Sequence, residues 1–284
     1  MTKTIDGPSE TYCLIGDPID RSLSPVMFNS AFKSIGLNST YIAFRVRKGE
    51  LQSSLHSLQA TKISGFNVTI PHKVDILPYI EILDLTAKKA CAVNTVHSVG
   101  GRFTGYNTDV YGFIEPLNRR HISLNGMKVL VIGSGGAARA IVAALSDQTG
   151  ISNLVIVNRT AHNAHNLLRL ASTLGLKADF AKLEKLGGLA QKSDLIINST
   201  SPGSFTQSQL NHEDIPRGSV VYDIVYMPMM TNLIEQARIA HATVIYGYEM
   251  LLAQGAKAFE IWTRLDAPLE VMKKALLGPF GEPS

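Results

Sequence analysis

The sequence predicts an α/β fold with two domains, each built around a mostly parallel sheet. Short apolar runs alternate with amphipathic segments along most of the chain, which is the pattern of strands connected by helices. The length of 284 residues suits two domains of roughly 100–200 residues each. Apolar residues make up 45% of the chain and charged residues 18%, so the chain can bury a core and is not intrinsically disordered.

The first 110 residues contain the first set of alternating elements. Strands are expected at 12–16, 40–46 and 63–70, and helices at 24–35 and 49–60. Ser24 is expected to be the N-cap of the first helix, with Pro25 at the first helical position and Gly36 ending it. Two further strands, at 92–97 and 102–106, flank Gly100 and Gly101, which predicts a hairpin.

A second set of elements begins at Lys128. The apolar runs 129–132, 154–157, 194–198, 220–225 and 244–246 are expected to be buried strands, with helices in most of the gaps. Helices are also expected at 231–240, 249–262 and 268–277. No long flexible linker separates the two sets, so we expect a second domain over 111–247 and a cleft between the two domains.

A glycine-rich loop follows the first strand of the second domain. The residues Gly133-Ser134-Gly135-Gly136-Ala137-Ala138 fit the pattern G-x-G-x-x-A. Gly133 would permit the tight turn, Gly135 would let the backbone approach a pyrophosphate, and Ala138 would let the helix pack on the strand. The N–H groups at the helix N-terminus would bind the phosphates. An ordinary strand–helix turn is the alternative, but the context favours a Rossmann dinucleotide-binding domain.

The next strand indicates which dinucleotide is bound. It ends in Val157-Asn158-Arg159-Thr160. An NAD site usually places Asp or Glu there to bind the ribose 2′-hydroxyl. Arg159 stands there instead, and a guanidinium can pair with a 2′-phosphate. The sequence therefore predicts NADP, the alternative being that Arg159 is an ordinary surface charge.

Four polar patches lie at expected strand ends in the first domain. They are Ser22-Leu23-Ser24-Pro25, Asn67-Val68-Thr69-Ile70-Pro71-His72-Lys73, Ala92-Val93-Asn94-Thr95 and Gly105-Tyr106-Asn107-Thr108-Asp109. Two hydroxyls beside a helix N-terminus, as at Ser22 and Ser24, could hold a carboxylate. Taken singly, each patch also has an ordinary explanation. Ser24 and Asp109 could be helix caps, and a lone lysine such as Lys73 is usually solvated.

Together these patches resemble, in type and order, the motifs of shikimate dehydrogenases. The resemblance includes the glycine loop, Asn158-Arg159-Thr160, Tyr222-Asp223-Ile224-Val225-Tyr226 and Gly247-Tyr248-Glu249-Met250-Leu251-Leu252-Ala253-Gln254, and it extends from about residue 11 to 277. It implies a substrate-binding domain over 1–110, an NADP-binding Rossmann domain over 111–247, and C-terminal helices over 248–284 that return to the substrate domain. The implied activity is the reversible NADPH-dependent reduction of 3-dehydroshikimate to shikimate, in aromatic amino acid (chorismate) biosynthesis.

The resemblance also implies roles for the motif residues of the first domain. Lys73 would bind the substrate and exchange a proton at the reacting oxygen, with Asp109 beside it as the second catalytic residue. Hydride arriving at a carbonyl carbon leaves negative charge on oxygen, which an ammonium group stabilises and can protonate. Ser22 and Ser24 would hold the substrate carboxylate. The ring hydroxyls would be held by Thr69, Asn94, Asp109 and Gln254, with Asn67 and Tyr226 in support.

The cofactor half follows in the same way. The diphosphate would be bound by Gly133, Ser134, Gly135, Gly136 and Ala137. The adenosine 2′-phosphate would be bound by Asn158, Arg159 and Thr160, and the backbones of Ile224 and Gly247 would line the nicotinamide pocket. Some positions depart from the family pattern: Asn163 stands where a second basic residue often follows, and Cys91 replaces the usual glycine. The segment 85–90 is also about two residues short, and Ala87 stands where the family has an acidic residue that can contact the cofactor. These departures bear on cofactor preference and not on the implied chemistry.

Composition restricts the other classes of function. Lys and Arg number 27 against 23 for Asp and Glu, a net charge of +4 without a basic block, so nucleic-acid binding is not expected. No apolar run reaches the ~18 residues of a membrane span and the first residues lack a secretory apolar core, so we expect a cytoplasmic protein without membrane contact. The cysteines and histidines lack metal-ligand spacing, so no metal is expected. A homodimer is one option for its assembly.

Two rival functions stay open at this point. A quinate/shikimate dehydrogenase that uses both NAD and NADP would have the same fold, although Arg159 and the serine pair favour the narrower enzyme. A non-catalytic NADP-binding sensor is the more distant alternative, and it would need neither Lys73 nor Asp109.

Overall fold

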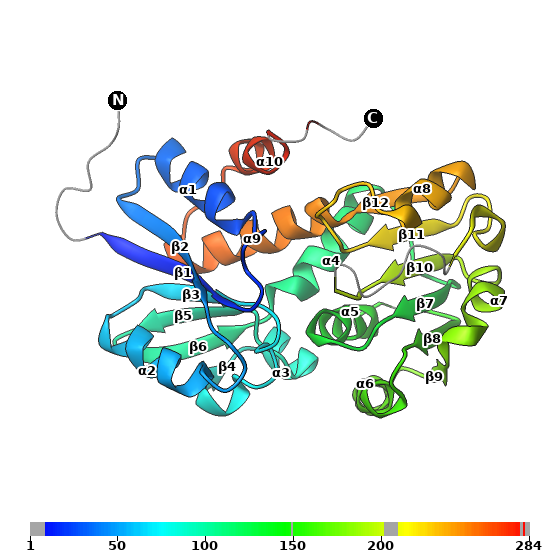
Figure 1. Ribbon diagram of the computed structural model, residues 1–284, viewed down its shortest axis with the longest axis horizontal. Helices are drawn as coiled ribbons and strands as arrows, with labels where there is room; N and C mark the ends of the chain where they lie inside the picture. Colours follow the sequence, from blue (N-terminus) through cyan, green and yellow to red (C-terminus); the bar gives the residue numbers. More distant parts are fainter. Residues whose placement is uncertain (1–8, 149, 202–209, 279–280, 282–284) are drawn as a thin grey trace. The chain divides into compact units, whose positions relative to one another are not determined.

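The computed structural model describes residues 9–148, 150–201, 210–278 and 281, and the chain divides into two compact units (Figure 1). The terminal unit contains the chain up to Thr108 together with Gln254–Glu282, and the central unit contains Asp109–Ala253. The boundaries lie at the start of helix α4 (Thr108–Arg119) and within helix α9 (Gly247–Thr263).

Within the described residues, the terminal unit is built on a six-stranded sheet with the order β2-β1-β3-β5-β6-β4. The strands are β1 (Glu10–Gly16), β2 (Ser39–Arg45), β3 (Gly65–Val68), β4 (Ile82–Leu83), β5 (Thr95–Val99) and β6 (Arg102–Tyr106). The pairs β1–β2, β1–β3 and β4–β6 are parallel, whereas β3–β5 and β5–β6 are antiparallel. Gly100 and Gly101, with φ angles of 59° and 78°, form the turn of the predicted hairpin between β5 and β6.

The terminal unit contains four helices and one 3₁₀ turn in the described residues, besides the part of α9 that belongs to it. They are α1 (Ser24–Ser34), α2 (Leu51–Ala60), α3 (Leu85–Ala90), α10 (Leu269–Leu277) and the 3₁₀ turn η1 (Leu77–Tyr79). The buried residues of α2 are Leu51, Leu55 and Leu58, which share one helix face and join the core of the sheet. Helix α1 packs against β2 and α10 (Figure 1).

An aromatic cluster lies beneath α1 in the terminal unit. Its members are Tyr12, Phe28, Phe32, Tyr41, Phe259 and Trp262. Tyr41 stacks on Phe28 with ring centroids 4.5 Å apart, and Tyr12 stacks on Trp262 at 4.8 Å. Trp262 also donates from Nε1 to Val96 O at 2.9 Å, which ties α9 to β5. These large rings bury much apolar surface and add the favourable energy of stacked pairs.

Strand β2 is the outermost strand of the terminal sheet in the described part of the chain. Asn29 of α1 binds its main chain from the outer side. Asn29 Nδ2 donates to Tyr41 O at 2.9 Å, and Tyr41 N–H donates to Asn29 Oδ1 at 2.9 Å. One side chain therefore makes at Tyr41 the two hydrogen bonds that a further strand would make.

The central unit contains an all-parallel sheet whose six described strands have the order β12-β11-β10-β7-β8-β9. They are β7 (Lys128–Ile132), β8 (Asn153–Val157), β9 (Ala178–Ala181), β10 (Leu195–Asn198), β11 (Val220–Asp223) and β12 (Thr243–Tyr246). The connecting helices include α5 (Gly136–Ser146), α6 (Ala161–Thr173), α7 (Leu186–Ala190) and α8 (Asn232–Ile239), with 3₁₀ turns η2 (Leu183–Lys185) and η3 (His212–Asp214). This strand order is that of a Rossmann domain, so the predicted α/β class is confirmed.

The start of α1 differs from the prediction. Ser24 is the first helical residue, Leu23 occupies the N-cap position, and no side chain caps this helix. Ser22 takes part of the expected role, because its hydroxyl accepts from Ser24 N–H at 3.3 Å. A serine two residues before the first helical residue can accept from the backbone in this way, so the Ser24 N–H group gains a side-chain acceptor.

Three predicted strands are shorter than their apolar runs, and one of them, 63–70, forms a strand only over Gly65–Val68. The run 220–225 forms a strand only to Asp223, because Val225 N–H donates to the Asp223 carboxylate at 3.0 Å rather than to a strand. The run 92–97 forms a strand only from Thr95, because Val93 N–H donates to Lys73 O at 2.7 Å. The sheet ends where side chains or loops take over the main-chain hydrogen bonds.

Candidate active site

The polar patches of the terminal unit meet at one end of its strands. The chain leaves the parallel neighbours β1 and β3 at the same end, after Gly16 and Val68. Because β5 is antiparallel to β3, it begins at this end, and β6 finishes there at Tyr106. Asp17 N–H donates to Ile70 O at 2.8 Å, which joins the loops that follow β1 and β3. Topology therefore collects the four patches that are far apart in the sequence.

The segment that carries Lys73 is held by contacts on both sides. His72 is 1% exposed, and its Nε2 lies 2.8 Å from Val46 O. Lys73 O accepts from Val93 N–H at 2.7 Å, directly before Asn94 in the chain. His72 is thus a buried structural residue, and the Lys73 main chain lies beside the third polar patch.

Thr69 lies close to the loop that leads to the serine pair. A Cβ on Gly16 would lie 2.7 Å from Ile70 O and would also collide with Thr69 Cγ2, so the close approach requires glycine. Thr69 N–H donates to Ile15 O at 2.9 Å. The structure therefore brings Thr69 next to the end of β1.

Asn94 is the centre of a buried polar cluster and is 3% exposed. Its Oδ1 accepts from Thr108 N–H at 2.7 Å, which satisfies one of the N–H groups that the first turn of α4 leaves without a helical partner. Its Nδ2 donates to Thr108 Oγ1 at 2.9 Å and to Gln254 Oε1 at 3.4 Å. The structure thus joins Asn94 and Gln254 across 160 positions of the chain.

Asn67 belongs to the same cluster, and its amide is engaged inside the protein. Its Oδ1 accepts from the Tyr41 hydroxyl at 2.7 Å. Its Nδ2 donates to Thr95 Oγ1 at 2.9 Å and to Asn94 O at 3.2 Å. Both amide hydrogens have protein acceptors, which agrees with a supporting position for Asn67.

Sequence reasoning gives no role to Tyr41, Thr95 and Thr108, which complete this cluster. Thr95 and Thr108 stand in the polar patches, next to Asn94 and Asp109, so their position in the sequence could have indicated that they belong to the site. Tyr41 lies in an ordinary strand pattern and gives no such signal. Asn107, in the same patch as Thr108, is fully buried and donates from Nδ2 to Ala92 O at 2.8 Å.

The remaining predicted residues of the first-domain motifs lie at helix starts. Asp109 stands in the first turn of α4 and is 5% exposed. A carboxylate at this position is stabilised by the helix dipole. Ser24 is buried in the first turn of α1, and Ser22 is half-buried just before it. Two hydroxyls thus stand beside the N–H groups of a helix terminus.

The glycine loop of the central unit has the conformation that a dinucleotide site requires. Gly133 has a φ of 106°, and a Cβ there would lie 2.7 Å from Ser199 Oγ, so glycine is needed on both grounds. Gly135 is the N-cap of α5, and no atom of the described residues lies within 4 Å of where its Cβ would be. Ala138 is fully buried against the sheet. The loop therefore offers main-chain N–H groups and open space to a diphosphate.

The predicted 2′-phosphate residues follow β8, which neighbours β7 in the sheet. Asn158 Nδ2 donates to Thr160 O at 2.9 Å and so holds the turn, while Arg159 is exposed. Because all strands of this sheet are parallel, these residues lie at the same end as the glycine loop. An exposed guanidinium at this position suits a phosphate ester.

Ile224 and Gly247 lie against each other at the ends of β11 and β12. A Cβ on Gly247 would lie 2.5 Å from Ile224 O and 2.5 Å from Val225 O, so only glycine permits this approach. Tyr226 is half-buried two residues after Ile224. The structure thus unites the two backbones that were predicted to line one pocket.

A buried carboxylate holds the segment that carries Ile224 and Tyr226. Asp223 is 1% exposed, and its Oδ1 accepts from Asn198 Nδ2 at 2.9 Å. Its Oδ2 accepts from the Thr231 hydroxyl at 2.6 Å. Burial raises the pKa of Asp223, and its hydrogen bonds act in the opposite direction. The carboxylate therefore joins β10, β11 and the start of α8.

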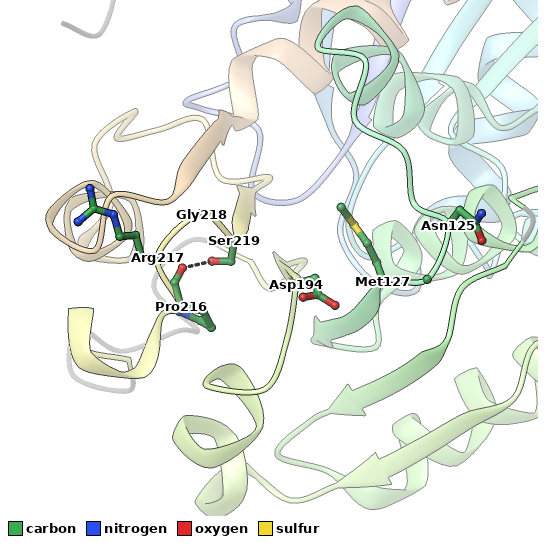
Figure 2. Close-up of a pocket in the computed structure, with 8 residues that line it drawn as sticks. Asn125, Met127, Asp194, Pro216, Arg217, Gly218 and Ser219 are labelled. Carbon is green, nitrogen blue, oxygen red and sulfur yellow. Dashed lines mark hydrogen bonds between the residues drawn. The ribbon is translucent and has the colours of Figure 1, made fainter.

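A depression of about 430 Å³ lies elsewhere in the central unit (Figure 2). Its lining residues are 125–127, 194 and 216–219, which precede β7, β10 and β11. These are the amino ends of the strands, opposite the glycine loop. The Ser219 hydroxyl donates to Pro216 O at 2.7 Å, and the Arg217 side chain points away from Asp194 (Figure 2). Ligands of open α/β sheets bind at the carboxyl ends of the strands, so this depression is not the active site.

The described part of the chain has no cluster of three or more His, Cys, Asp or Glu side chains that could hold a metal ion. None of the helices in that part is both long and apolar enough to cross a membrane.

Comparisons with known proteins agree with this geometry. Residues 14–96 match the shikimate dehydrogenase substrate binding domain, 116–226 match the shikimate / quinate 5-dehydrogenase model, and 247–277 match the shikimate 5'-dehydrogenase C-terminal domain. A shikimate dehydrogenase (NADP(+)) of Nitrosopumilus maritimus is 44% identical over 272 residues, which cover 95% of this chain and 99% of the relative. The chain belongs to the shikimate dehydrogenase family.

Solved structures of shikimate dehydrogenases share the fold. One, in complex with NADP+, has a TM-score of 0.87 and 35% identity and covers 96% of this chain and 96% of its own. Another, from Thermus thermophilus in complex with NADP(H) and shikimate, has a TM-score of 0.80 and 33% identity, with 94% of this chain and 98% of its own covered. The family membership and fold that the motifs predicted are confirmed.

Proposed function

We propose that this protein is an NADP-dependent shikimate dehydrogenase. It catalyses the reversible reduction of 3-dehydroshikimate to shikimate, a step of aromatic amino acid biosynthesis through chorismate. The observation that carries this function is the 44% identity, over 95% of the chain, to a relative of that name. The structure supports this function, because Asn94 lies beside both Gln254 and the Lys73 main chain in the terminal unit.

In this proposal residues of the terminal unit make most of the substrate contacts, and the central unit adds Asp109 and Tyr226. Ser22 and Ser24 hold the carboxylate with the help of the N-terminus of α1. The ring hydroxyls are held by Thr69, Asn94, Asp109 and Gln254, while Asn67 and Tyr226 give support. The burial of Asn94 and Gln254, at 3% and 8% exposure, supports this role, because a buried amide binds a hydroxyl without competition from water.

Lys73 and Asp109 are the proposed catalytic residues. Bound NADPH supplies the hydride for the carbonyl carbon of 3-dehydroshikimate. The Lys73 ammonium stabilises the negative charge that develops on the carbonyl oxygen and donates the proton that completes the hydroxyl. In the reverse direction the Lys73 amine accepts this proton. The Asp109 carboxylate accepts a hydrogen bond from a substrate hydroxyl.

The central unit is proposed to bind NADP. Gly133, Ser134, Gly135, Gly136 and Ala137 bind the diphosphate; Asn158, Arg159 and Thr160 bind the 2′-phosphate; and the backbones of Ile224 and Gly247 line the nicotinamide pocket. The open space at Gly135 and the exposed guanidinium of Arg159 support these roles.

A matrix of two substrates and two cofactors tests the function. Shikimate and quinate are each combined with NADP and NAD, and the absorbance of the reduced cofactor is followed. The fastest reaction is expected for shikimate with NADP. Comparable rates with quinate and with NAD would assign a quinate/shikimate dehydrogenase of dual cofactor use. Absence of reduction in all four combinations would leave an NADP-binding sensor.

The proposed location is the cytoplasm, where reduced thiols such as those of Cys13 and Cys91 are stable. The proposed assembly is a homodimer, which light scattering coupled to size-exclusion chromatography would measure.

A further inference from the structure

Six buried or partly buried polar groups of the terminal unit form one continuous chain of hydrogen bonds, which we name the polar chain. Its members are Tyr41, Asn67, Thr95, Asn94, Thr108 and Gln254. The Tyr41 hydroxyl lies at one end, within the aromatic cluster, and Gln254 lies at the other end. The polar chain therefore connects the hydrophobic interior with two residues to which the proposed function gives contacts with the substrate.

A main-chain donor fixes the direction of the polar chain at Asn94. Thr108 N–H can only donate, so the Asn94 atom that it meets at 2.7 Å must be the oxygen. The other side of the Asn94 amide is then the NH₂ group, and it faces Gln254 at 3.4 Å. Gln254 must meet this donor with its carbonyl oxygen, which places its amide nitrogen on the side turned away from the polar chain.

A main-chain acceptor fixes the direction at the other end. Asn94 O can only accept, so the Asn67 atom 3.2 Å from it must be the amide nitrogen. Asn67 therefore turns its oxygen toward Tyr41, and the Tyr41 hydroxyl donates to it at 2.7 Å. Thr95 completes the sequence, because it accepts from Asn67 at 2.9 Å and donates to Asn94 Oδ1 at 2.9 Å.

We propose that Tyr41 and Thr95 are positioning residues for the substrate pocket, acting through Asn67 and Asn94 on the amide of Gln254. The main chain sets the orientation of the two asparagine amides, and the two hydroxyls hold these amides in place. Gln254 then turns its oxygen to Asn94 and offers its nitrogen, a donor, to a hydroxyl oxygen of the substrate. This inference rests on the proposed substrate-binding roles of Asn94 and Gln254. A rotated amide would present an acceptor instead and would require the substrate hydroxyl to donate.

Tyr41 is suited to this role by its surroundings. It is 2% exposed, and its ring stacks on Phe28 with an interplanar angle of 16°. Asn29 fixes its main chain through two hydrogen bonds. The hydroxyl is thus held from the ring and from the backbone, so it acts as a fixed donor at the start of the polar chain.

The substitution Tyr41→Phe removes this donor and keeps the ring. We expect the KM and the calorimetric Kd for shikimate to rise about five-fold, as for the loss of one ordered hydrogen bond, with the Kd for NADP unchanged. Tyr12→Phe is the matched control. Tyr12 is 1% exposed in the same aromatic cluster, but its hydroxyl donates to Glu10 Oε2 at 2.6 Å, outside the polar chain. It should change the melting temperature without changing the affinity for shikimate.

A double-mutant cycle tests whether the two hydroxyls act as one unit. Thr95→Val interrupts the polar chain between Asn67 and Asn94 and should raise the KM for shikimate by a similar factor. If the polar chain transmits the effect, the double variant should show about five-fold rather than the ~25-fold that independent effects would give. Multiplicative effects would overturn the inference.

The remaining outcomes separate this inference from the proposed function. If Tyr41→Phe lowers the melting temperature but leaves the Kd for shikimate unchanged, Tyr41 is merely structural and the inference is wrong. Gln254→Ala forms the separate arm. If Gln254→Ala raises the KM for shikimate but Tyr41→Phe does not, the inference is wrong and the proposed function still stands. An unchanged KM for Gln254→Ala removes the proposed role of Gln254 and the inference with it.

Discussion

The proposed sites of the two units differ in how they are built. In the central unit the proposed site depends on main-chain geometry, with a φ of 106° at Gly133 and open space at Gly135. In the terminal unit it depends on side chains, since Asn94 and Gln254 are joined through their amides. A site made from main chain is disturbed by adding an atom, whereas a site made from side chains is disturbed by removing one.

The first prediction concerns the side chain on which the proposed chemistry depends. Lys73→Ala should lower kcat at least ~100-fold, the low end of general acid–base contributions. The Kd for NADP, measured by fluorescence titration, should stay unchanged because the central unit binds the cofactor. Lys88→Ala, which removes an exposed lysine of α3, is the matched control. If the Lys73→Ala enzyme kept the wild-type kcat, Lys73 would be an ordinary solvated lysine without a catalytic role.

The second prediction adds an atom to the central unit. Gly133→Ala should lower the free energy of unfolding by about 2 kcal/mol, because the left-handed φ and the contact with Ser199 both oppose a Cβ. Gly135→Ala should change it by less than about 0.5 kcal/mol and still weaken NADP binding, because its Cβ would occupy the open space beside the loop. Chemical denaturation and titration with NADP measure both quantities. Equal losses of stability would contradict the main-chain explanation.

The third prediction tests the charged side chain among the three residues that are proposed to bind the 2′-phosphate. Arg159→Ala should raise the KM for NADP about ten-fold while leaving that for NAD nearly unchanged, since a charge-assisted hydrogen bond to the 2′-phosphate is lost. Arg169→Ala, an exposed arginine on α6, serves as the control. Equal changes for both cofactors would reject the phosphate role.

The fourth prediction has the smallest effect and concerns the pH dependence of stability, which is expected to differ in sign between a group of the terminal unit and one of the central unit. Burial, and next the charge of Arg264, lower the pKa of His97 in the terminal unit below its usual 6.5. As the pH falls through 6.5, the unfolded chain binds the proton before the folded one, so stability is lost on acidification. His97→Gln should reduce the drop in melting temperature between about pH 7.5 and 5.5 by about 2 °C.

Asp223, the buried acid of the central unit, changes stability with pH in the opposite direction. The raised pKa of Asp223 means that the folded state favours the protonated form, so its contribution is lost as the pH rises through the folded-state pKa. An unchanged acid limb in His97→Gln, measured by calorimetry across this range, would show that His97 does not account for the acid sensitivity of the terminal unit.

The same difference explains what could be predicted from the sequence. The glycine loop was predictable because glycine at fixed offsets is the direct record of a backbone requirement, as Gly133 shows. Tyr41 was not predictable, because its contact with Asn67 depends on the packing of β2 and β3 around β1, which no local pattern records. Ser24 was wrongly predicted to be the N-cap because the helix begins one residue earlier than the Ser-Pro pattern indicates, with Leu23 at the N-cap position.

Asn29 has a consequence for the protein in concentrated solution. An unprotected edge strand can pair with a strand of another chain, and repeated pairing of this kind produces fibrous aggregates. At β2 an incoming chain would first have to displace the Asn29 amide from Tyr41, with the loss of two hydrogen bonds. The Asn29 side chain thus opposes the addition of a further strand to this edge of the sheet at Tyr41.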